Sequence, residues 1–263
     1  MDAMATPSAR KALLFTAGGV RLALPLGAVR EIALVDRRGG EMQVRGAELE
    51  ALSVARALGL PDGPGRYALF LEGSGPPALL ADELFGIADL VEAEVFSLPA
   101  RTVLPDPPPF GAAFLLRGDL YLELSLAGLE AQRRAVPAER RPAPADGPPT
   151  ERELFCERAG LSIAVPLSLL VQVIEPARVF PVPLTQADHR GLLYHGRALH
   201  PVFDAAALLG EPDAGSPRVL LLLDAGGGSA GILVDRVRGV GEGEGTGPVR
   251  RPPWDVLLSP HGA

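Results

Sequence analysis

The chain has few of the residues on which common chemical sites are built. It contains one cysteine, Cys156, which excludes an internal disulfide and a multi-cysteine metal site. Aromatic residues make up 5% of the sequence, so a core must consist mostly of Leu, Val and Ala. No apolar run approaches the roughly 20 residues of a membrane-spanning helix, and no secretory signal is evident. We therefore expect no direct membrane insertion and a cytoplasmic location.

Basic residues are also fewer than acidic residues. The chain has 25 Lys and Arg against 32 Asp and Glu, which gives a formal net charge of −7 at pH 7. Nucleic acid and anionic membranes recruit proteins through basic faces, so we expect neither as a partner. The abundant residues are Gly (31) and Pro (27), which favour turns and short elements, and 263 residues suit two domains.

An internal repeat is the strongest feature of the sequence. Residues 19–26, Gly-Val-Arg-Leu-Ala-Leu-Pro-Leu, match residues 160–167, Gly-Leu-Ser-Ile-Ala-Val-Pro-Leu, without a gap. Upstream, Leu14-Phe15 pairs with Leu154-Phe155 after one inserted residue. Further matches follow in the same order, 55–59 with 206–210 and 80–87 with 233–240. A duplicated domain is therefore predicted.

The segment between the two copies has the composition of a linker. Residues 131–150 hold five prolines, four arginines and no aromatic residue, so they cannot bury enough surface to fold. We predict a first domain at 11–130, a linker at 131–150, a second domain at 151–240 and a Gly/Pro-rich tail at 241–263.

Local patterns predict mostly short strands. Residues 120–126 are apolar at alternate positions, as in a half-buried strand. Apolar runs separated by Gly-rich turns predict one hairpin in each copy, from 67–71 with 78–81 and from 219–223 with 232–234.

Two short helices are also expected. The first covers 48–58, and the second covers 204–209, where Asp204 would cap the start and Gly210 the end.

Several segments resemble a known family. Ala-Leu-Pro-Leu at 23–26, followed by Val-Arg-Glu-Ile at 29–32, resembles the opening of a CheW-like domain. Residues 191–204 resemble the family's glycine, Asn-Leu-Arg-Gly, proline and aspartate signature. Residues 230–240 resemble its later Gly-hydrophobic-Val-Asp-x-Val block.

Each copy departs from the family pattern in a different place. In the second copy Tyr194 replaces Asn, and Gly196-Arg197 reverses the Arg-Gly order. In the first copy Arg45-Gly46 keeps that order, but Glu50 and Ser53 replace the proline and the aspartate.

The end of the second copy departs further. It lacks the family's closing strands, which the first copy keeps at 110–126. The apolar residues 254–258 in the tail are interpreted as a strand that replaces this missing end, with a docking peptide as the alternative.

The resemblance implies both a fold and a role. The fold is mainly β, with tandem CheW-like domains, each built from small SH3-like five-stranded β-barrel subdomains with short helices. The role is that of a non-enzymatic adaptor, without a cofactor, recruited to membrane-associated receptor arrays. It would couple the cytoplasmic tip of chemoreceptors to the regulatory domain of a CheA-type histidine kinase. The alternative is a ligand-binding or regulatory module that reuses the fold outside such an array.

Small β domains offer edge strands and grooves to partners, which makes residues of the matched motifs candidates for partner binding. For the aliphatic candidates, plain core packing is the competing explanation. The candidates are Val29, Glu31, Ile32, Arg45, Gly46, Leu170, Val173, Gly191, Arg197, Pro201, Asp204, Asp235, Arg236 and Arg238.

No catalytic or metal-binding constellation can be assembled. His189, His195 and His200 lie close together, but their spacing fits neither a helix face nor one side of a strand, so surface or structural roles are expected. The glycine-rich segment 226–231 lacks the Lys-Ser/Thr of a phosphate loop, and Cys156 has no evident base nearby. We therefore expect no enzymatic activity.

Overall fold

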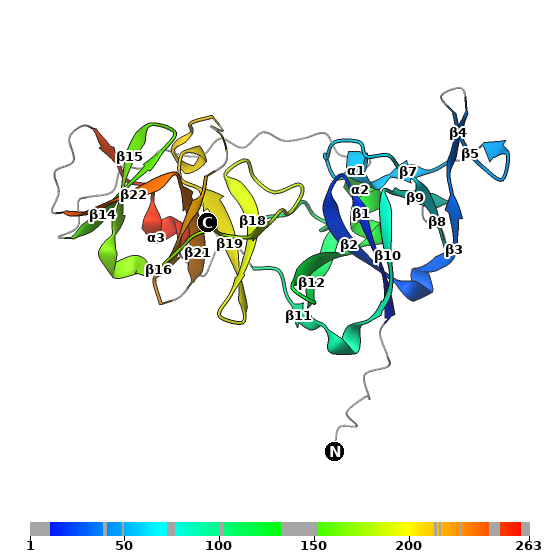
Figure 1. Ribbon diagram of the computed structural model, residues 1–263, viewed down its shortest axis with the longest axis horizontal. Coiled ribbons are helices and arrows are strands. Elements are labelled where there is room, and N and C mark those ends of the chain that lie inside the picture. The colour runs from blue at the N-terminus through cyan, green and yellow to red at the C-terminus, as the bar shows by residue number, and fades with distance from the viewer. Residues whose placement is uncertain are drawn as a thin grey trace, which may run out of the picture. The chain divides into compact units, whose positions relative to one another are not determined.

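The computed structural model describes residues 11–38, 41–48, 50–72, 77–99, 102–132, 152–212, 215, 217–226, 228–241 and 248–258. The chain divides into two units. The first comprises Met1–Leu98 and Leu104–Pro137, and the second comprises Pro99–Val103 and Ala138–Ala263. The predicted mainly β architecture is confirmed (Figure 1). From residue 133 onward, the predicted linker lies outside the described residues.

The first unit is built from short strands and a few helical turns. In chain order these are β1 (Lys11–Ala17), β2 (Val20–Pro25), the 3-10 helix η1 (Leu26–Ala28), β3 (Val29–Leu34), β4 (Asp36–Arg38), β5 (Glu41–Val44), β6 (Ala47–Glu48), β7 (Leu52–Ser53), α1 (Val54–Ala57), β8 (Tyr67–Leu71), β9 (Ala78–Ala81), β10 (Glu83–Asp89), η2 (Leu90–Glu92), β11 (Glu94–Phe96), β12 (Phe110–Leu116), β13 (Asp119–Leu124) and α2 (Leu126–Gln132). Its sheets have the orders β10-β1-β2-β13-β12-β11, β3-β8-β9-β7 and β4-β5-β6.

The second unit follows the same plan. Its elements are β14 (Glu153–Arg158), β15 (Leu161–Pro166), η3 (Leu167–Leu169), β16 (Leu170–Ile174), β17 (Val179–Phe180), β18 (His189–His195), β19 (Ala198–Asp204), η4 (Ala207–Leu209), β20 (Val219–Asp224), β21 (Ser229–Val234), β22 (Arg236–Gly241), β23 (Val249–Arg250) and α3 (Trp254–Leu257). Its sheets have the orders β22-β14-β15-β23 and β16-β20-β21-β19-β18-β17. In the described parts of both units, no sheet has the expected five strands.

The repeat is visible in the strand registers. Ala12 lies opposite Pro25 in the first hairpin, and Glu153 lies opposite Pro166 in its counterpart. The two hairpins therefore match residue for residue, and the one-residue insertion expected upstream is wrong. Leu13 and not Leu14 corresponds to Leu154. Adjacent apolar residues allowed both alignments in the sequence, and only the hydrogen-bonded pairing decides between them.

Both hairpins end in the same way. β2 ends at Pro25 and β15 ends at Pro166, because proline has no N–H to continue the ladder. A 3-10 turn follows in each unit and leads into a strand, β3 or β16, that forms the edge of the next sheet.

The predicted hairpins agree with the structure, whereas the predicted helices are too long. The strands Tyr67–Leu71 and Ala78–Ala81 have the expected bounds. In place of a helix over 48–58, residues 47–48 and 52–53 are strands, and only Val54–Ala57 is helical. Its start is capped by the Ser53 hydroxyl, which accepts a hydrogen bond from the Arg56 N–H.

The second predicted helix and two predicted boundaries also shift. In place of a helix over 204–209, β19 runs to residue 204 and a 3-10 helix covers 207–209, ended by Gly210 at φ 79°. The strand expected over 120–126 ends at residue 124, since α2 begins at 126, and β21 begins at Ser229, inside the expected loop.

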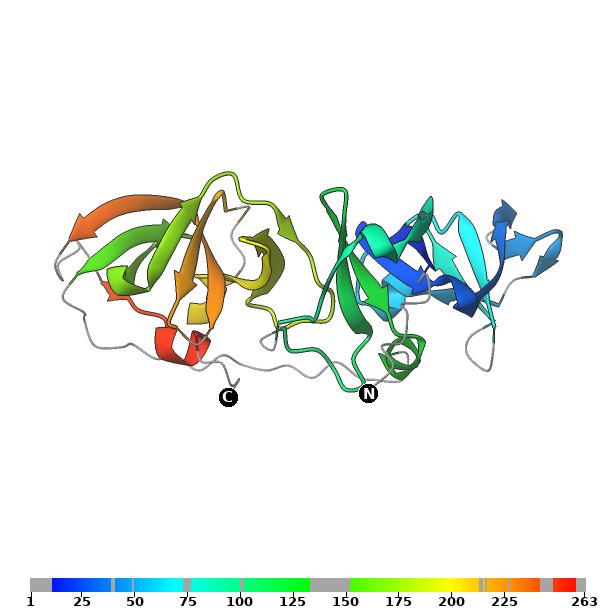
Figure 2. The same ribbon diagram turned by 90° about the horizontal axis from the view of Figure 1, so that it is seen from below.

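The tail belongs to the fold of the second unit. Residues 249–250 form β23, which pairs in parallel with β15, and residues 254–257 form α3 (red in Figure 2). The expected strand over 254–258 is therefore wrong. Trp254, Leu257 and Leu258 are buried in the core, and the Trp254 indole N–H donates to the Ala164 carbonyl at 3.2 Å. The tail replaces the end of the second copy with a strand and a helix.

None of the helices in the described part of the chain is long and apolar enough to cross a membrane.

Candidate binding surfaces and the buried ion-pair cluster

A buried ion-pair cluster joins the two sheets of the second unit. Arg158, at the end of β14, is fully buried, and so is Asp204 at the end of β19. The Arg158 guanidinium donates to both carboxylate oxygens of Asp204, with a shortest distance of 2.7 Å, and to Asp235 at 2.9 Å. It also donates to the Gly215 carbonyl at 3.2 Å. The Arg190 guanidinium donates at 3.3 Å to Asp204 Oδ2, the oxygen that lies 2.7 Å from Arg158.

The ion pair with Arg158 keeps the buried carboxylate of Asp204 ionised. Burial by itself would raise the pKa of Asp204, but the hydrogen bonds and charge of Arg158 outweigh burial and hold this pKa below its ordinary value. Asp204 also accepts from the backbone N–H groups of Ala206 and Ala207, which caps the turn that follows β19. The cluster therefore fixes three segments of the second unit against one another.

The first unit lacks this cluster, because two of its three corresponding positions hold other residue types. The strand registers place Ala17 where Arg158 stands and Ser53 where Asp204 stands, while Asp82 corresponds to Asp235. Asp82 instead accepts from the backbone N–H groups of Gly18 and Gly65, both at 2.8 Å. The arginine and its main carboxylate partner are thus absent together.

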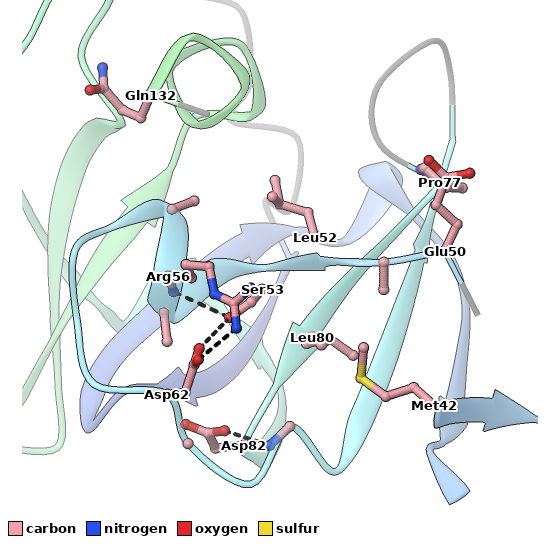
Figure 3. Close-up of a pocket in the computed structure, with 15 residues that line it drawn as sticks. Met42, Glu50, Leu52, Ser53, Arg56, Asp62, Pro77, Leu80, Asp82 and Gln132 are labelled. Carbon is pink, nitrogen blue, oxygen red and sulfur yellow. Dashed lines mark hydrogen bonds and ion pairs between the residues drawn. The ribbon is translucent and has the colours of Figure 1, made fainter. Parts of the chain in front are cut away.

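An open pocket of about 520 Å³ lies beside Asp82 in the first unit (Figure 3). Three of its polar side chains are hydrogen-bonded to one another. Asp62 accepts from the Ser53 hydroxyl at 3.1 Å and from the Arg56 guanidinium at 2.8 Å. Glu50 and Met42 line the other end (Figure 3). The pocket therefore presents one positive and one negative side chain, Arg56 and Asp62, both of them exposed.

The second unit has a shallower pocket at the equivalent place. It measures about 430 Å³ and is lined by Asp204 and Leu233, whose counterparts Ser53 and Leu80 line the first pocket. The pocket is therefore a property of the repeated fold.

A salt bridge crosses the surface of the first unit between two candidate residues. Arg45 lies in the tight turn between β5 and β6, and its guanidinium donates to the carboxylate of Glu31 on β3. Arg45 and Gly46 both have positive φ, 52° and 79°, and the corresponding turn of the second unit, Gly196-Arg197, has φ values of 58° and 63°. The reversed Arg-Gly order thus preserves the turn but moves the arginine.

Exposed aliphatic side chains mark the same edge strand in both units. On β3, Ile32 is 38% exposed and Val29 is half-buried. On β16, Val173 is 42% exposed and Leu170 is half-buried against the core. Ile32 and Val173 hold corresponding positions, so each unit presents an apolar side chain at one edge of its second sheet.

A second candidate surface is the β22 edge of the second unit. Arg236 and Arg238 are exposed and both donate to Glu157, and these hydrogen bonds hold the pKa of Glu157 below its ordinary value. Asp235 precedes them and belongs to the ion-pair cluster.

Other candidates from the sequence serve the fold. Gly191 is buried at φ 133°, and a Cβ there would lie 2.1 Å from the Phe180 carbonyl oxygen. Pro201 and Asp204 are also buried. We assign these three residues to structure, whereas Arg197 is exposed in its turn.

The histidines and the cysteine considered as chemical sites lie in the packing of the second unit. His189 is buried edge-on against Phe203, and burial lowers its pKa to about 4. His200 contacts Ser229 at 2.7 Å and the His195 carbonyl at 3.1 Å. Burial raises the pKa of the Cys156 thiol to about 12. In the described segments, no group of three His, Cys, Asp or Glu side chains is arranged to hold a metal.

Comparison with protein families gives a match within the second unit, to the CheW-like domain over residues 154–244. Residues 154–244 are thus similar to a CheW-like domain. The chain is also similar to the solved structure of the scaffolding protein TtCheW from Thermoanaerobacter tengcongensis, with 19% sequence identity and a TM-score of 0.33. That similarity covers 36% of this chain and 65% of TtCheW, so the chain spans less than two thirds of that protein. None of the curated proteins matches.

The CheW-like match stops before the tail. It ends at residue 244, while β23 and α3 lie at 249–250 and 254–257. The second unit therefore continues beyond the matched segment with one strand and one helix. The ion-pair cluster lies wholly inside the matched segment.

Arg158 is the main residue that the sequence reasoning missed. A detectable signal existed, because Arg158 continues the inward alternation of Leu154 and Cys156 on β14. A buried arginine needs a carboxylate partner to offset the cost of removing its charge from water, so the pattern could have predicted a buried ion pair.

Proposed function

We propose that this chain is a non-enzymatic adaptor of a chemosensory assembly, which couples chemoreceptors to a CheA-type histidine kinase by binding both. The observation that carries the proposal is the CheW-like domain at residues 154–244. The first unit repeats its element order and hairpin register, which supports a second copy of the same domain.

The exposed edge strands support binding rather than chemistry. Ile32 and Val173 present corresponding apolar side chains, and an edge strand can accept a partner's strand or the apolar face of a partner's helix. By contrast, Cys156 is buried with a raised thiol pKa, and Ser53, Arg56 and Asp62 in the first pocket are hydrogen-bonded to one another.

Different residues remain in the two copies, which supports a division of labour. The first unit holds the surface pair Glu31 and Arg45, whereas the corresponding positions of the second unit are Gln172 and Gly196. The second unit holds the buried cluster that the first has lost. We infer that one copy binds the kinase and the other the receptor, and two sites on one chain raise avidity for an array.

The test is a titration of the full-length chain against the regulatory domain of a CheA-type kinase and, separately, against a receptor cytoplasmic fragment. Ile32→Asp and Val173→Asp each place a charge in one edge strand. We expect each variant to weaken one partner at least tenfold and leave the other unchanged.

Matched controls are Val91→Asp on η2 and Val95→Asp on β11, since both side chains are more than half exposed and lie outside the two edge strands. The proposal fails if neither partner binds the folded chain, or if the controls weaken binding as much as the edge variants do.

A ligand-binding role is the second candidate, favoured by the pockets of about 520 and 430 Å³ at equivalent places. It predicts that a small molecule raises the melting temperature of the chain, and that Asp62→Asn or Arg56→Ala abolishes this shift. If the chain binds the kinase and no small molecule raises its melting temperature, the adaptor role is favoured.

A further inference from the structure

The first sheet of the second unit is two strands shorter than its counterpart. In the first unit the sheet continues from β13 to β12 and β11, whereas among the described residues of the second unit it ends at β23. Between β10 and β13 the first unit has residues 90–118, which supply β11 and β12. Between β22 and β23 the second unit has only residues 242–248, too few for two strands and their turns.

β23 and α3 correspond to β13 and α2 residue by residue. Leu122 lies opposite Leu22, and Arg250 lies opposite Ile163, which is the counterpart of Leu22. The helices begin four residues after these positions. Each carries the same first backbone bond, from the Leu129 N–H to the Ser125 carbonyl and from the Leu257 N–H to the Pro253 carbonyl.

The first unit shows what lies against this edge. There β12 pairs antiparallel with β13, with Phe114 opposite Tyr121 and Ala113 opposite Leu122. Phe114 is buried in a cluster with Leu14 and Ala23. The covering element is thus an extended strand that buries two aromatic side chains, Phe110 and Phe114, of which Phe114 lies opposite Tyr121.

The second unit keeps part of the receiving surface. The counterparts of Leu14, Ala23 and Tyr121 are Phe155, Ala164 and Val249, all of them apolar. Phe155 and Val249 are half-buried.

Charged residues replace the rest of that surface. Glu153 stands at the position of Ala12 and binds Arg251 through two hydrogen bonds of 2.9 and 2.8 Å. Arg250, half-buried on β23, stands at the position of Leu122. A strand placed like β12 would meet Val249 with one residue and Arg250 with its neighbour.

We propose that the β23 edge of the second unit binds an extended segment of a partner protein by strand addition, antiparallel to β23. The segment carries an aromatic residue opposite Val249 and an acidic residue opposite Arg250. Main-chain hydrogen bonds provide the attachment, and the two side chains provide the selectivity. This binding is separate from the edges β3 and β16, and does not depend on the coupling role.

The first unit supplies the probe. A peptide of residues 108–118, which contains β12, is made with Ala113→Glu and with Ala113→Lys. Each is titrated into the full-length chain by calorimetry, with the fluorescence of Trp254, the one tryptophan of the chain, as a second signal. Trp254 donates to the Ala164 carbonyl on β15, the strand beside β23, so it reports on this sheet.

The chain variant Arg250→Glu makes the test reciprocal, and Arg238→Glu on β22 is its matched control. We expect the Ala113→Glu peptide to bind the natural chain at least tenfold more tightly than the Ala113→Lys peptide. Arg250→Glu should reverse this order, which a merely unfolded variant cannot do, and Arg238→Glu should not.

Two results overturn the proposal. One is that neither peptide binds saturably up to about millimolar concentration. The other is that the preference persists in Arg250→Glu, because the peptide would then occupy another surface, such as the β12 position of the first unit.

Discussion

Removing one member of the buried ion-pair cluster should destabilise the second unit strongly, and removing two should cost less than the sum. Arg158→Ala leaves Asp204 buried without the guanidinium that donates to both of its oxygens. Removing one partner of a buried ion pair costs about 3–5 kcal/mol, and only Arg190, at 3.3 Å, then remains as a positive charge at Asp204. Asp204→Ser leaves Arg158 with Asp235 and the Gly215 carbonyl, and a similar loss is expected.

The first unit indicates the outcome for the double variant. It has Ala17 and Ser53 at these two positions and keeps a buried core. Arg158→Ala with Asp204→Ser should therefore recover about 2 kcal/mol relative to the sum of the single losses, since residues that share an ion pair couple by about 0.5–3 kcal/mol.

The assay is urea unfolding followed by the fluorescence of Trp254, which is buried in the core of the second unit and so reports on that unit. With a slope of about 2 kcal/mol per molar urea, a loss of 4 kcal/mol moves the midpoint down by about 2 M. Arg236→Ala, which removes an exposed arginine, is the control and should leave the midpoint unchanged. A shift below about 0.5 M for Arg158→Ala, or strict additivity of the two variants, would refute this account of the cluster.

Three further predictions concern the same unit. Burial lowers the pKa of His189 to about 4, against about 6.5 when unfolded, so between these pH values only the unfolded chain binds the proton. Stability of the second unit should therefore fall by up to about 3 kcal/mol as the pH drops from 6.5 to 4, and urea titrations of His189→Gln should lose most of this dependence. The thiol of Cys156, with a pKa of about 12, should not react with a thiol reagent at pH 8 until urea unfolds the unit; prompt reaction in native buffer would contradict its burial. Gly191→Ala should lower the urea midpoint by the equivalent of about 2 kcal/mol or more, because φ is 133° and the added Cβ would lie 2.1 Å from the Phe180 carbonyl oxygen, whereas Gly196→Ala, in an open turn, should cost less.

The duplication could be predicted from the sequence because its signals are local. The strand that ends at Pro25 or Pro166 and the later Asp82 or Asp235 keep their residue types and order in both copies. The apolar runs and the Gly-rich turns between them then predict the central hairpins, and β8 and β9 have the expected bounds. The prediction of a helix over 48–58 was wrong because Leu52 and Ser53 pair with the distant strand β9, and a local pattern does not reveal such pairing.

The binding surfaces could be predicted only in part. Ile32 belongs to a family-like motif, Val173 holds the corresponding position in the second copy, and both are exposed on edge strands. Gly191 and Asp204 belong to the same motifs but are buried, since a motif residue can be retained for backbone geometry or for charge pairing. The role of β23 was not predictable, because two residues that pair in parallel with a distant strand leave no periodic signal.

The central claim is that this chain joins a kinase to receptors through its two copies, and one measurement tests it most directly. Full-length chain is immobilised, saturated with a receptor cytoplasmic fragment, and then titrated with the regulatory domain of a CheA-type kinase from the same cell. The account predicts a ternary complex in which the kinase domain binds the receptor-loaded chain with the same stoichiometry as the free chain. Competition between the two partners, or failure of the folded chain to bind the kinase domain at all, would contradict it.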